Sequence, residues 1–139
     1  MPLEEIVTAH GHEHVTADHE STFEVTTDDY LTPSGDCILG IEADRAPADF
    51  DSDFVDACRD EDATITAHIA VGSVSEHITG RGDPRLSFES QRSLVGRTST
   101  YVDDRTVLVD GDRAAADLHR DVVSELEAGA GLTLRLVVS

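Results

Sequence analysis

Histidines are the residues in this sequence whose type and spacing suit metal chemistry. Four of the seven lie close together near the start of the chain: His10, His12, His14 and His19. Imidazole nitrogens bind transition-metal ions, so the sequence predicts His12 and His19 as ligands of a divalent transition metal. Asp36 or Glu13 would complete the shell. The alternative is that the histidines around Gly11 are solvated residues of an exposed turn, since the sequence contains no known metal-binding motif.

One histidine also suits proton transfer. His19 falls on the apolar side of an alternating stretch, between Ala17 and Ser21. A buried imidazole needs partners for both ring nitrogens, and histidine titrates near neutral pH. Asp36 follows Gly35 at the start of a predicted strand, where a turn can aim its carboxylate into a cleft. His19 and Asp36 are therefore the predicted catalytic residues. The alternatives are a core histidine bonded to a backbone carbonyl and a turn-capping aspartate.

Arginines supply a candidate anion site. Arg97 and Arg105 flank a predicted strand, turn and strand, and guanidinium groups bind phosphate or carboxylate through paired hydrogen bonds. The sequence predicts Arg97, Arg105 and Thr106 as ligand-binding residues. The alternative is that the arginines anchor surface acids such as Asp103 and Asp104. The sequence has no Gly-rich phosphate loop and no dinucleotide-binding motif, and it leaves open whether the protein is an enzyme.

The charge balance points to a habitat. The chain has 29 acidic and 10 basic residues, a net charge of −19 and a pI near 4.4. Every basic residue is Arg, and this one-sided composition is typical of halophilic proteins. The charge disfavours nucleic acid as a partner without excluding it, because molar salt shortens the Debye length to about 3 Å.

The apolar segments predict a cytoplasmic protein that does not enter a membrane. The longest of them, such as residues 132–138, are too short to span a bilayer, and residues 1–5 lack the basic region of a signal peptide. The two cysteines, Cys37 and Cys58, fall among apolar neighbours and are expected to be reduced core thiols.

Hydrophobic periodicity predicts a β-rich α+β chain. The predicted strands are residues 3–10, 14–26, 37–41, 63–79, 86–90, 94–102, 106–109 and 132–138. The turn 11–13 is expected to join the first two strands as a hairpin, and Gly72 to bend the longest strand. Helices are predicted between Asp44 and Cys58, with Asp44 as the cap, and over residues 113–127.

The two halves of the sequence resemble each other. Residues 41–50 (IEADRAPADF) and 109–118 (VDGDRAAADL) are identical at five of ten positions. The sequence therefore predicts a single domain, residues 1–139, built by internal duplication of pseudo-repeats at approximately 1–68 and 69–139. Each half would have about three strands and one helix, around a strongly bent or barrel-like sheet. The recurring Asp-Arg pairs are expected to be helix caps and ion pairs, not a site.

Several short stretches carry a family resemblance. They are Gly11-His12-Glu13, the strand with His19, residues 32–40 with Gly-Asp-Cys-Ile, Asp104-Arg105-Thr106 and Asp112-Arg113-Ala114-Ala115. With these stretches the whole chain resembles a haloarchaeal member of the archaeal domain of unknown function family 371. The resemblance implies a soluble archaeal protein, and the family's name supplies no activity.

Three functional hypotheses remain open from the sequence. In the first, His19 and Asp36 face Arg97 and Arg105 across the two halves and bind, or act on, a small anionic ligand. The second is a non-catalytic protein or ribonucleoprotein interaction module that uses an exposed strand edge. The third is metal binding by the N-terminal histidines. The oligomeric state is undetermined.

Overall fold

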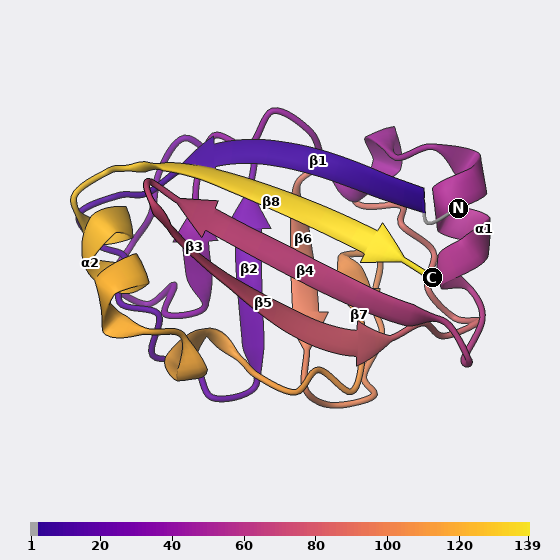
Figure 1. Ribbon diagram of the computed structural model, residues 1–139. Helices are drawn as coiled ribbons and strands as arrows, with labels where there is room; N and C mark the ends of the chain where they lie inside the picture. The colour runs from indigo at the N-terminus through magenta and orange to yellow at the C-terminus, as the bar shows by residue number, and fades with distance from the viewer. Residues whose placement is uncertain (1–2) are drawn as a thin grey trace.

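Two four-stranded β-sheets form most of the structure, a computed structural model that describes residues 3–139 (Figure 1). The antiparallel sheet has the order β1 (Leu3–His10), β8 (Gly131–Val138), β4 (Thr64–Val71) and β5 (Val74–Arg81). The mixed sheet has the order β3 (Ile38–Gly40), β2 (Thr22–Thr26), β6 (Ser93–Arg97) and β7 (Thr106–Leu108). Its central pair, β2 and β6, is antiparallel, and both outer pairs are parallel.

The hydrophobic core lies between the sheets, whose strands cross at a steep angle (Figure 1). Successive side chains of a strand point to opposite faces, so every second residue is buried. In β4 the buried set is Ile65, Ala67, Ile69 and Val71. From β2, Phe23 and Val25 reach the same core. The period-two pattern seen in the sequence therefore reflects burial against the opposite sheet.

Two short helices lie at opposite ends of the sheets (Figure 1). Within residues 3–139, no helix is long and apolar enough to cross a bilayer. Each follows one 3-10 turn: η1 (Pro47–Asp49) precedes α1 (Ser52–Cys58), and η2 (Ala115–Asp117) precedes α2 (Arg120–Glu127). The prediction of Asp44 as a cap is wrong. Asp51 caps α1 by accepting from Asp53 N, and His119 caps α2.

Two predicted strand arrangements are also wrong. Residues 3–10 and 14–26 do not form a hairpin: β1 pairs with β8, and β2 belongs to the other sheet. Val15 and Ala17 are buried as predicted, but they lie in an irregular segment, and Ala17 has a φ of 50°. The single long strand over 63–79 is a hairpin of β4 and β5, because Gly72 adopts a φ of 59° and turns the chain.

The sheets do not close into the predicted barrel. Single bridges join them at two corners, between His10 and Ile41 and between Arg81 and Val109. The α+β class with two helices is as predicted, but the eight strands form two open sheets instead of one bent or barrel-like sheet.

The recurring Asp-Arg pairs fasten the loops after β3 and β7 to the edges of the antiparallel sheet. Asp44 Oδ1 accepts from Thr8 N at 2.9 Å, and Asp44 N donates to Thr8 O at 2.9 Å. Asp112 makes the same two bonds with Thr79. Because these bonds imitate a strand partner, they occupy backbone groups of β1 and β5 that would otherwise be free. We call each such contact an edge clamp.

An arginine extends each edge clamp to a carboxylate of the same edge strand. Arg45 Nη2 lies 3.0 Å from Glu5 Oε1, and Arg113 binds Glu76 in the other half. Glu5 Oε2 also accepts from Asp51 N at 2.6 Å, at the start of α1. Arg45 and Arg113 thus form the predicted ion pairs, whereas Asp44 and Asp112 bind strand backbone and cap no helix. The ion pairs tie the edge strands to the helices.

Replacing Glu5 tests the edge clamp. We expect Glu5→Ala to lower the free energy of unfolding by about 2 to 3 kcal/mol, because it leaves Arg45 and the Asp51 amide without a charged acceptor. The measurement is urea unfolding. The matched control is Glu4→Ala. The Glu4 side chain is 47% exposed and pairs with Arg135, so its removal should lower the free energy of unfolding by under about 1 kcal/mol. Equal losses in both variants would contradict the clamp.

Candidate functional site

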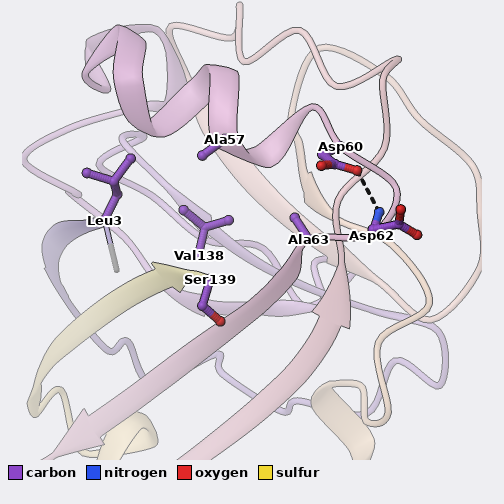
Figure 2. A pocket seen from close by; sticks show the side chains of 7 residues that line it. All are labelled: Leu3, Ala57, Asp60, Asp62, Ala63, Val138 and Ser139. Carbon is purple, nitrogen blue, oxygen red and sulfur yellow. Dashed lines mark hydrogen bonds between the residues drawn. The ribbon is translucent and has the colours of Figure 1, made fainter. Parts of the chain in front are cut away.

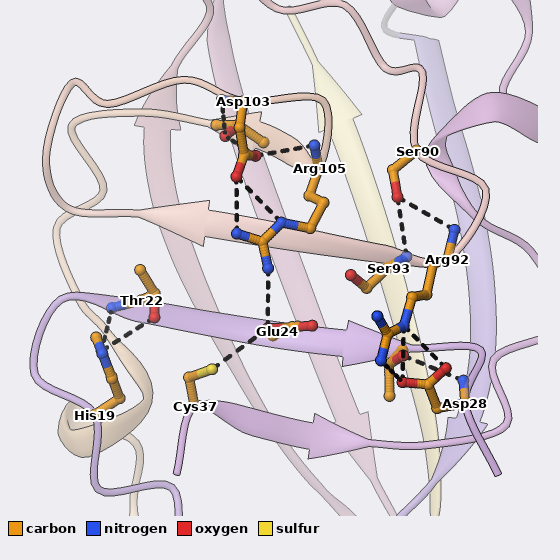
Figure 3. Close-up of polar contacts among 12 residues, drawn as sticks. His19, Thr22, Glu24, Asp28, Cys37, Ser90, Arg92, Ser93, Asp103 and Arg105 are labelled. Carbon is orange, nitrogen blue, oxygen red and sulfur yellow. Dashed lines mark hydrogen bonds and ion pairs between the residues drawn. The ribbon is translucent and has the colours of Figure 1, made fainter. Parts of the chain in front are cut away.

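Apart from His12, the predicted site residues lie on the outward side of the mixed sheet and on the loops beside it, where Figure 3 shows His19 and Arg105. Thr22 and Glu24 of β2 point away from the core, opposite to Phe23. Cross-strand pairing sets Thr22 beside Arg97 of β6. We call this surface the polar face. Its residues are His19, Thr22, Glu24, Asp36, Cys37, Arg97, Asp103, Arg105 and Thr106.

Asp103 brings Arg97, Arg105 and Thr106 together. Its Oδ2 accepts from Arg97 Nη2 at 2.9 Å and from Arg105 Nη2 at 2.7 Å. Its Oδ1 accepts from Thr106 Oγ1 at 3.1 Å, and Thr106 Oγ1 accepts in turn from Arg97 Nε. All three predicted ligand-binding residues therefore meet at the Asp103 carboxylate. This is the arrangement expected if the arginines anchor surface acids.

The two arginines differ in exposure. The Arg97 side chain is 10% exposed and lies against the Tyr101 ring, 4.8 Å from its centroid. The Arg105 side chain is 40% exposed. Asp103 holds Arg105 through Nε and Nη2, whereas Nη1 makes no hydrogen bond within residues 3–139 and lies 3.9 Å from Glu24 Oε1. Arg105 is therefore the more accessible of the two guanidinium groups on the polar face.

Glu24 and Cys37 occupy the middle of the polar face (Figure 3). The Cys37 thiol donates to Glu24 Oε1 at 3.5 Å. Burial raises the pKa of Cys37 to about 11, and the Glu24 carboxylate adds to the rise. Cys37 is thus a neutral thiol at physiological pH and a poor nucleophile. Cys58 is buried in the core, where desolvation raises its pKa to about 12.

His19 is a turn cap, only half-buried. Its Nδ1 accepts from the backbone N–H groups of Ser21 at 3.2 Å and Thr22 at 3.1 Å. The neutral ring therefore carries its proton on Nε2. In the second half of the chain Ser90 Oγ caps the turn before β6 in the same way. The Asp36 carbonyl accepts from His19 N at 3.2 Å, so the two predicted catalytic residues are neighbours through the backbone.

The histidines predicted to bind metal have separate contacts. His12 Nδ1 accepts from His14 N at 3.0 Å, and these two rings lie 5.1 Å apart. His19 contacts Thr22 instead. From residue 3 to the end of the chain, no group of three or more His, Cys, Asp or Glu side chains is arranged to hold a metal ion. Metal binding by His12 and His19 stays a prediction.

A cavity of about 350 Å³ lies elsewhere, between the end of α1 and the ends of β1, β4 and β8 (Figure 2). Its lining is Leu3, Ala57, Asp60, Asp62, Ala63, Val138 and Ser139. Asp60 Oδ1 accepts from Asp62 N at 2.8 Å. Local sequence patterns do not reveal this cavity, because its walls come from three segments that are far apart in sequence. No residue of the polar face lines it.

Glu24 and the central role of Asp103 were not predicted from the sequence. The pattern that could have indicated Glu24 is its place on the polar side of the alternating stretch that forms β2. Asp103 was predicted only as a surface acid that the arginines could anchor. Its spacing of two residues from Arg105 allows the carboxylate to bind both the backbone and the side chain of that arginine.

Two substitutions separate the capping role of His19 from any chemical role. We expect His19→Ala to lower the free energy of unfolding by about 1 kcal/mol, because two backbone donors lose their acceptor. His19→Ser restores an acceptor like that of Ser90, so its loss should stay below about 0.5 kcal/mol. Urea unfolding measures both. A serine variant as unstable as the alanine variant would show that the ring contributes more than the cap.

The Asp103 carboxylate gives a pH-dependent contribution to stability. Burial acts to raise the pKa of Asp103, but hydrogen bonds from Arg105 and the charges of Arg97 and Arg105 outweigh burial and hold the pKa at about 2. An aspartate titrates near 3.9 in the unfolded chain, so the contribution is full above about pH 4 and is lost as the pH falls toward 2.

We therefore expect Asp103→Asn to be less stable than the wild type by up to about 2 kcal/mol at pH 7, and the difference to shrink between pH 5 and pH 2. Urea unfolding across this range measures the difference. The control is Asp104→Asn at the exposed neighbouring position. A difference between wild type and Asp103→Asn that does not change with pH would contradict the ion pairs.

The similarity of this chain to known proteins extends over nearly its whole length. Residues 7–139 match the family described as Domain of unknown function (DUF371). An uncharacterized protein of Methanocaldococcus jannaschii is 35% identical over 136 residues, which cover 98% of this chain and 100% of that protein. These matches confirm the resemblance found in the sequence, whereas the haloarchaeal origin stays a prediction. The chain belongs to the DUF371 family.

Proposed function

We propose that the polar face binds a small anionic ligand and that Arg105 is the residue that anchors it. The observation that carries the proposal is the geometry of this guanidinium. Asp103 fixes Nε and Nη2, while the side chain remains 40% exposed and Nη1 makes no hydrogen bond within residues 3–139. A guanidinium held in this way loses little conformational freedom when it binds a carboxylate or phosphate.

The other predicted residues support this role in different ways. Arg97 and Thr106 hold Asp103 and so position Arg105, without contacting the ligand themselves. His19 accepts from Thr22 N through Nδ1, which leaves Nε2 free of these turn contacts, and Asp36 lies beside His19 through the backbone. Binding needs no catalytic step. If the ligand reacts, His19 is the residue that we propose for proton transfer.

Glu24 restricts the chemistry of the ligand. Its side chain is 14% exposed and lies 3.9 Å from Arg105 Nη1, so a bare anion at Arg105 would be repelled by the Glu24 carboxylate. A ligand with a hydroxyl or ammonium group next to its anionic group would donate to Glu24 and accept from Arg105. We therefore propose small 2-hydroxy acids or amino acids as the ligand class.

The alternative of an interaction module that uses an exposed strand edge has less support than the anion site. Asp44 and Asp112 already bind backbone groups of β1 and β5, so an added strand would have to displace the edge clamps. The metal alternative depends on His12 and His19, whose contacts are with different neighbours. We also infer a saline habitat from the net charge of −19 and the absence of Lys, and a cytoplasmic location from the shortness of the apolar segments.

We further propose that the chain arose by internal duplication, with pseudo-repeats at approximately 1–68 and 69–139. Recurring contacts support this. The Asp44 and Asp112 edge clamps match each other. Gly11 N donates to Ala130 O just before β8, and Gly82 N donates to Ala63 O just before β4. If the duplication is correct, the turn caps His19 and Ser90 are equivalent positions that have diverged, so the imidazole is a feature of one half only.

Ligand-dependent melting of wild type and two arginine variants tests the anion site. The probes are glycolate and glycine, with acetate and inorganic phosphate as simple anions, all at fixed ionic strength. We expect a saturable rise in Tm with glycolate or glycine, corresponding to about 2.7 kcal/mol at 100 times Kd. Arg105→Gln should abolish the rise. Arg92→Gln should keep it, because Arg92 binds Asp28 at the other end of the same face (Figure 3).

A third variant tests the restriction by Glu24. Glu24→Gln should bind acetate and phosphate more tightly than wild type does, because the repelling charge is gone. The anion site is refuted if none of the four probes gives a saturable shift, or if Arg105→Gln binds as well as wild type. Unchanged selectivity in Glu24→Gln would refute the proposed ligand class.

A further inference from the structure

The outward side of the antiparallel sheet has almost no acidic residues. The chain carries 29 acids, yet at the outward positions of β1, β8, β4 and β5 within residues 3–139 the only acid is Glu4. Arg135 neutralises Glu4 through an ion pair of 3.0 Å. Glu5 and Glu76 lie on these strands too, but they point inward to the edge clamps. We call this surface the neutral face.

The neutral face is broad and open. Strand pairing sets Ile6, Arg135, His68 and His77 side by side in one row across all four strands. Among residues 3–139, no helix or loop crosses in front of it (Figure 1). Ile6 is 43% exposed although it is a large apolar residue. Burial and the charges of Arg135 and His77 lower the pKa of His68, so its ring is uncharged at neutral pH.

We propose that the neutral face is the interface of a homodimer, in which the antiparallel sheets of two copies pack against each other. A second copy is the occupant that the charge distribution fits. Two chains with a net charge of −19 each repel each other wherever their acid-rich surfaces approach. Contact through the neutral face keeps most carboxylates of both copies away from the interface.

The dimensions of the sheet agree with a dimer. Four strands spaced by about 4.8 Å, each of eight residues rising about 3.4 Å, give roughly 500 Å² of face on each copy. The total of roughly 1,000 Å² is about the smallest area of a specific interface. Pairing through the sheet edges is disfavoured, because Asp44 and Asp112 occupy backbone groups of β1 and β5. Association therefore uses the face of the sheet.

Sedimentation equilibrium at low and molar KCl tests this inference. Wild type should have twice the monomer mass of 15.0 kDa, with a Kd that falls as salt screens the remaining repulsion. Ala70→Glu, at an exposed outward position of β4, should raise the Kd at least tenfold. The matched control Ser124→Glu adds the same charge on the exposed side of α2 and should leave the Kd unchanged.

A second variant guards against misfolding. Thr133→Glu adds charge at an exposed outward position of β8, away from the edge clamps, and circular dichroism melting must show that each variant tested is folded. The inference is overturned if wild type is monomeric at every concentration and salt level, or if folded Ala70→Glu and Thr133→Glu variants dimerise like wild type. It does not depend on the anion site, because Arg105 lies in the loop before β7 of the other sheet.

Discussion

The relation between the two sheets depends on the edge clamps. Asp44 and Asp112 follow the outer strands of the mixed sheet and bind the backbone of Thr8 and Thr79 in the edge strands of the antiparallel sheet. Hydrogen bonds to a charged acceptor contribute about 1.5 to 3 kcal/mol each, more than a neutral pair. Because Arg45 continues one clamp to Glu5, which also binds the start of α1, the same contact positions a helix. The polar-face loops with Asp36 and with Asp103 lead into β3 and β7, the two strands that the clamps follow.

Local sequence predicted the elements of the fold better than their partners. Alternation correctly identified β4 and β8, because it records which side of a strand is buried. It cannot say which strand lies alongside, so the predicted hairpin at the N-terminus was wrong. Val15 and Ala17 show a second weakness, since an irregular segment that buries alternate side chains has the same pattern as a strand. At Gly72 the sequence offered a bulge or bend, and the positive φ made a turn.

For the candidate site, sequence predicted three residues that do meet. Arg97, Arg105 and Thr106 share one carboxylate, but an arginine that binds a ligand and one that binds Asp103 look alike in sequence. His19 was expected to be buried, and it is instead half-exposed and caps a turn. Burial and hydrogen-bond partners depend on segments brought together from distant parts of the chain. Composition gave only the net charge, whereas the structure shows the two sheets presenting a polar face and a nearly acid-free face.

The pairing of the first strand with the last has a consequence for synthesis. β8 lies between β1 and β4 and forms long antiparallel ladders with both, so β1 cannot join the antiparallel sheet until residues 131–138 are made. Contacts of such large sequence separation form slowly, because the connecting chain must lose its entropy first. During translation β1 therefore has no strand partner in this sheet until residues 131–138 have been made. The hairpin of β4 and β5 can form earlier, and β8 then joins it to β1.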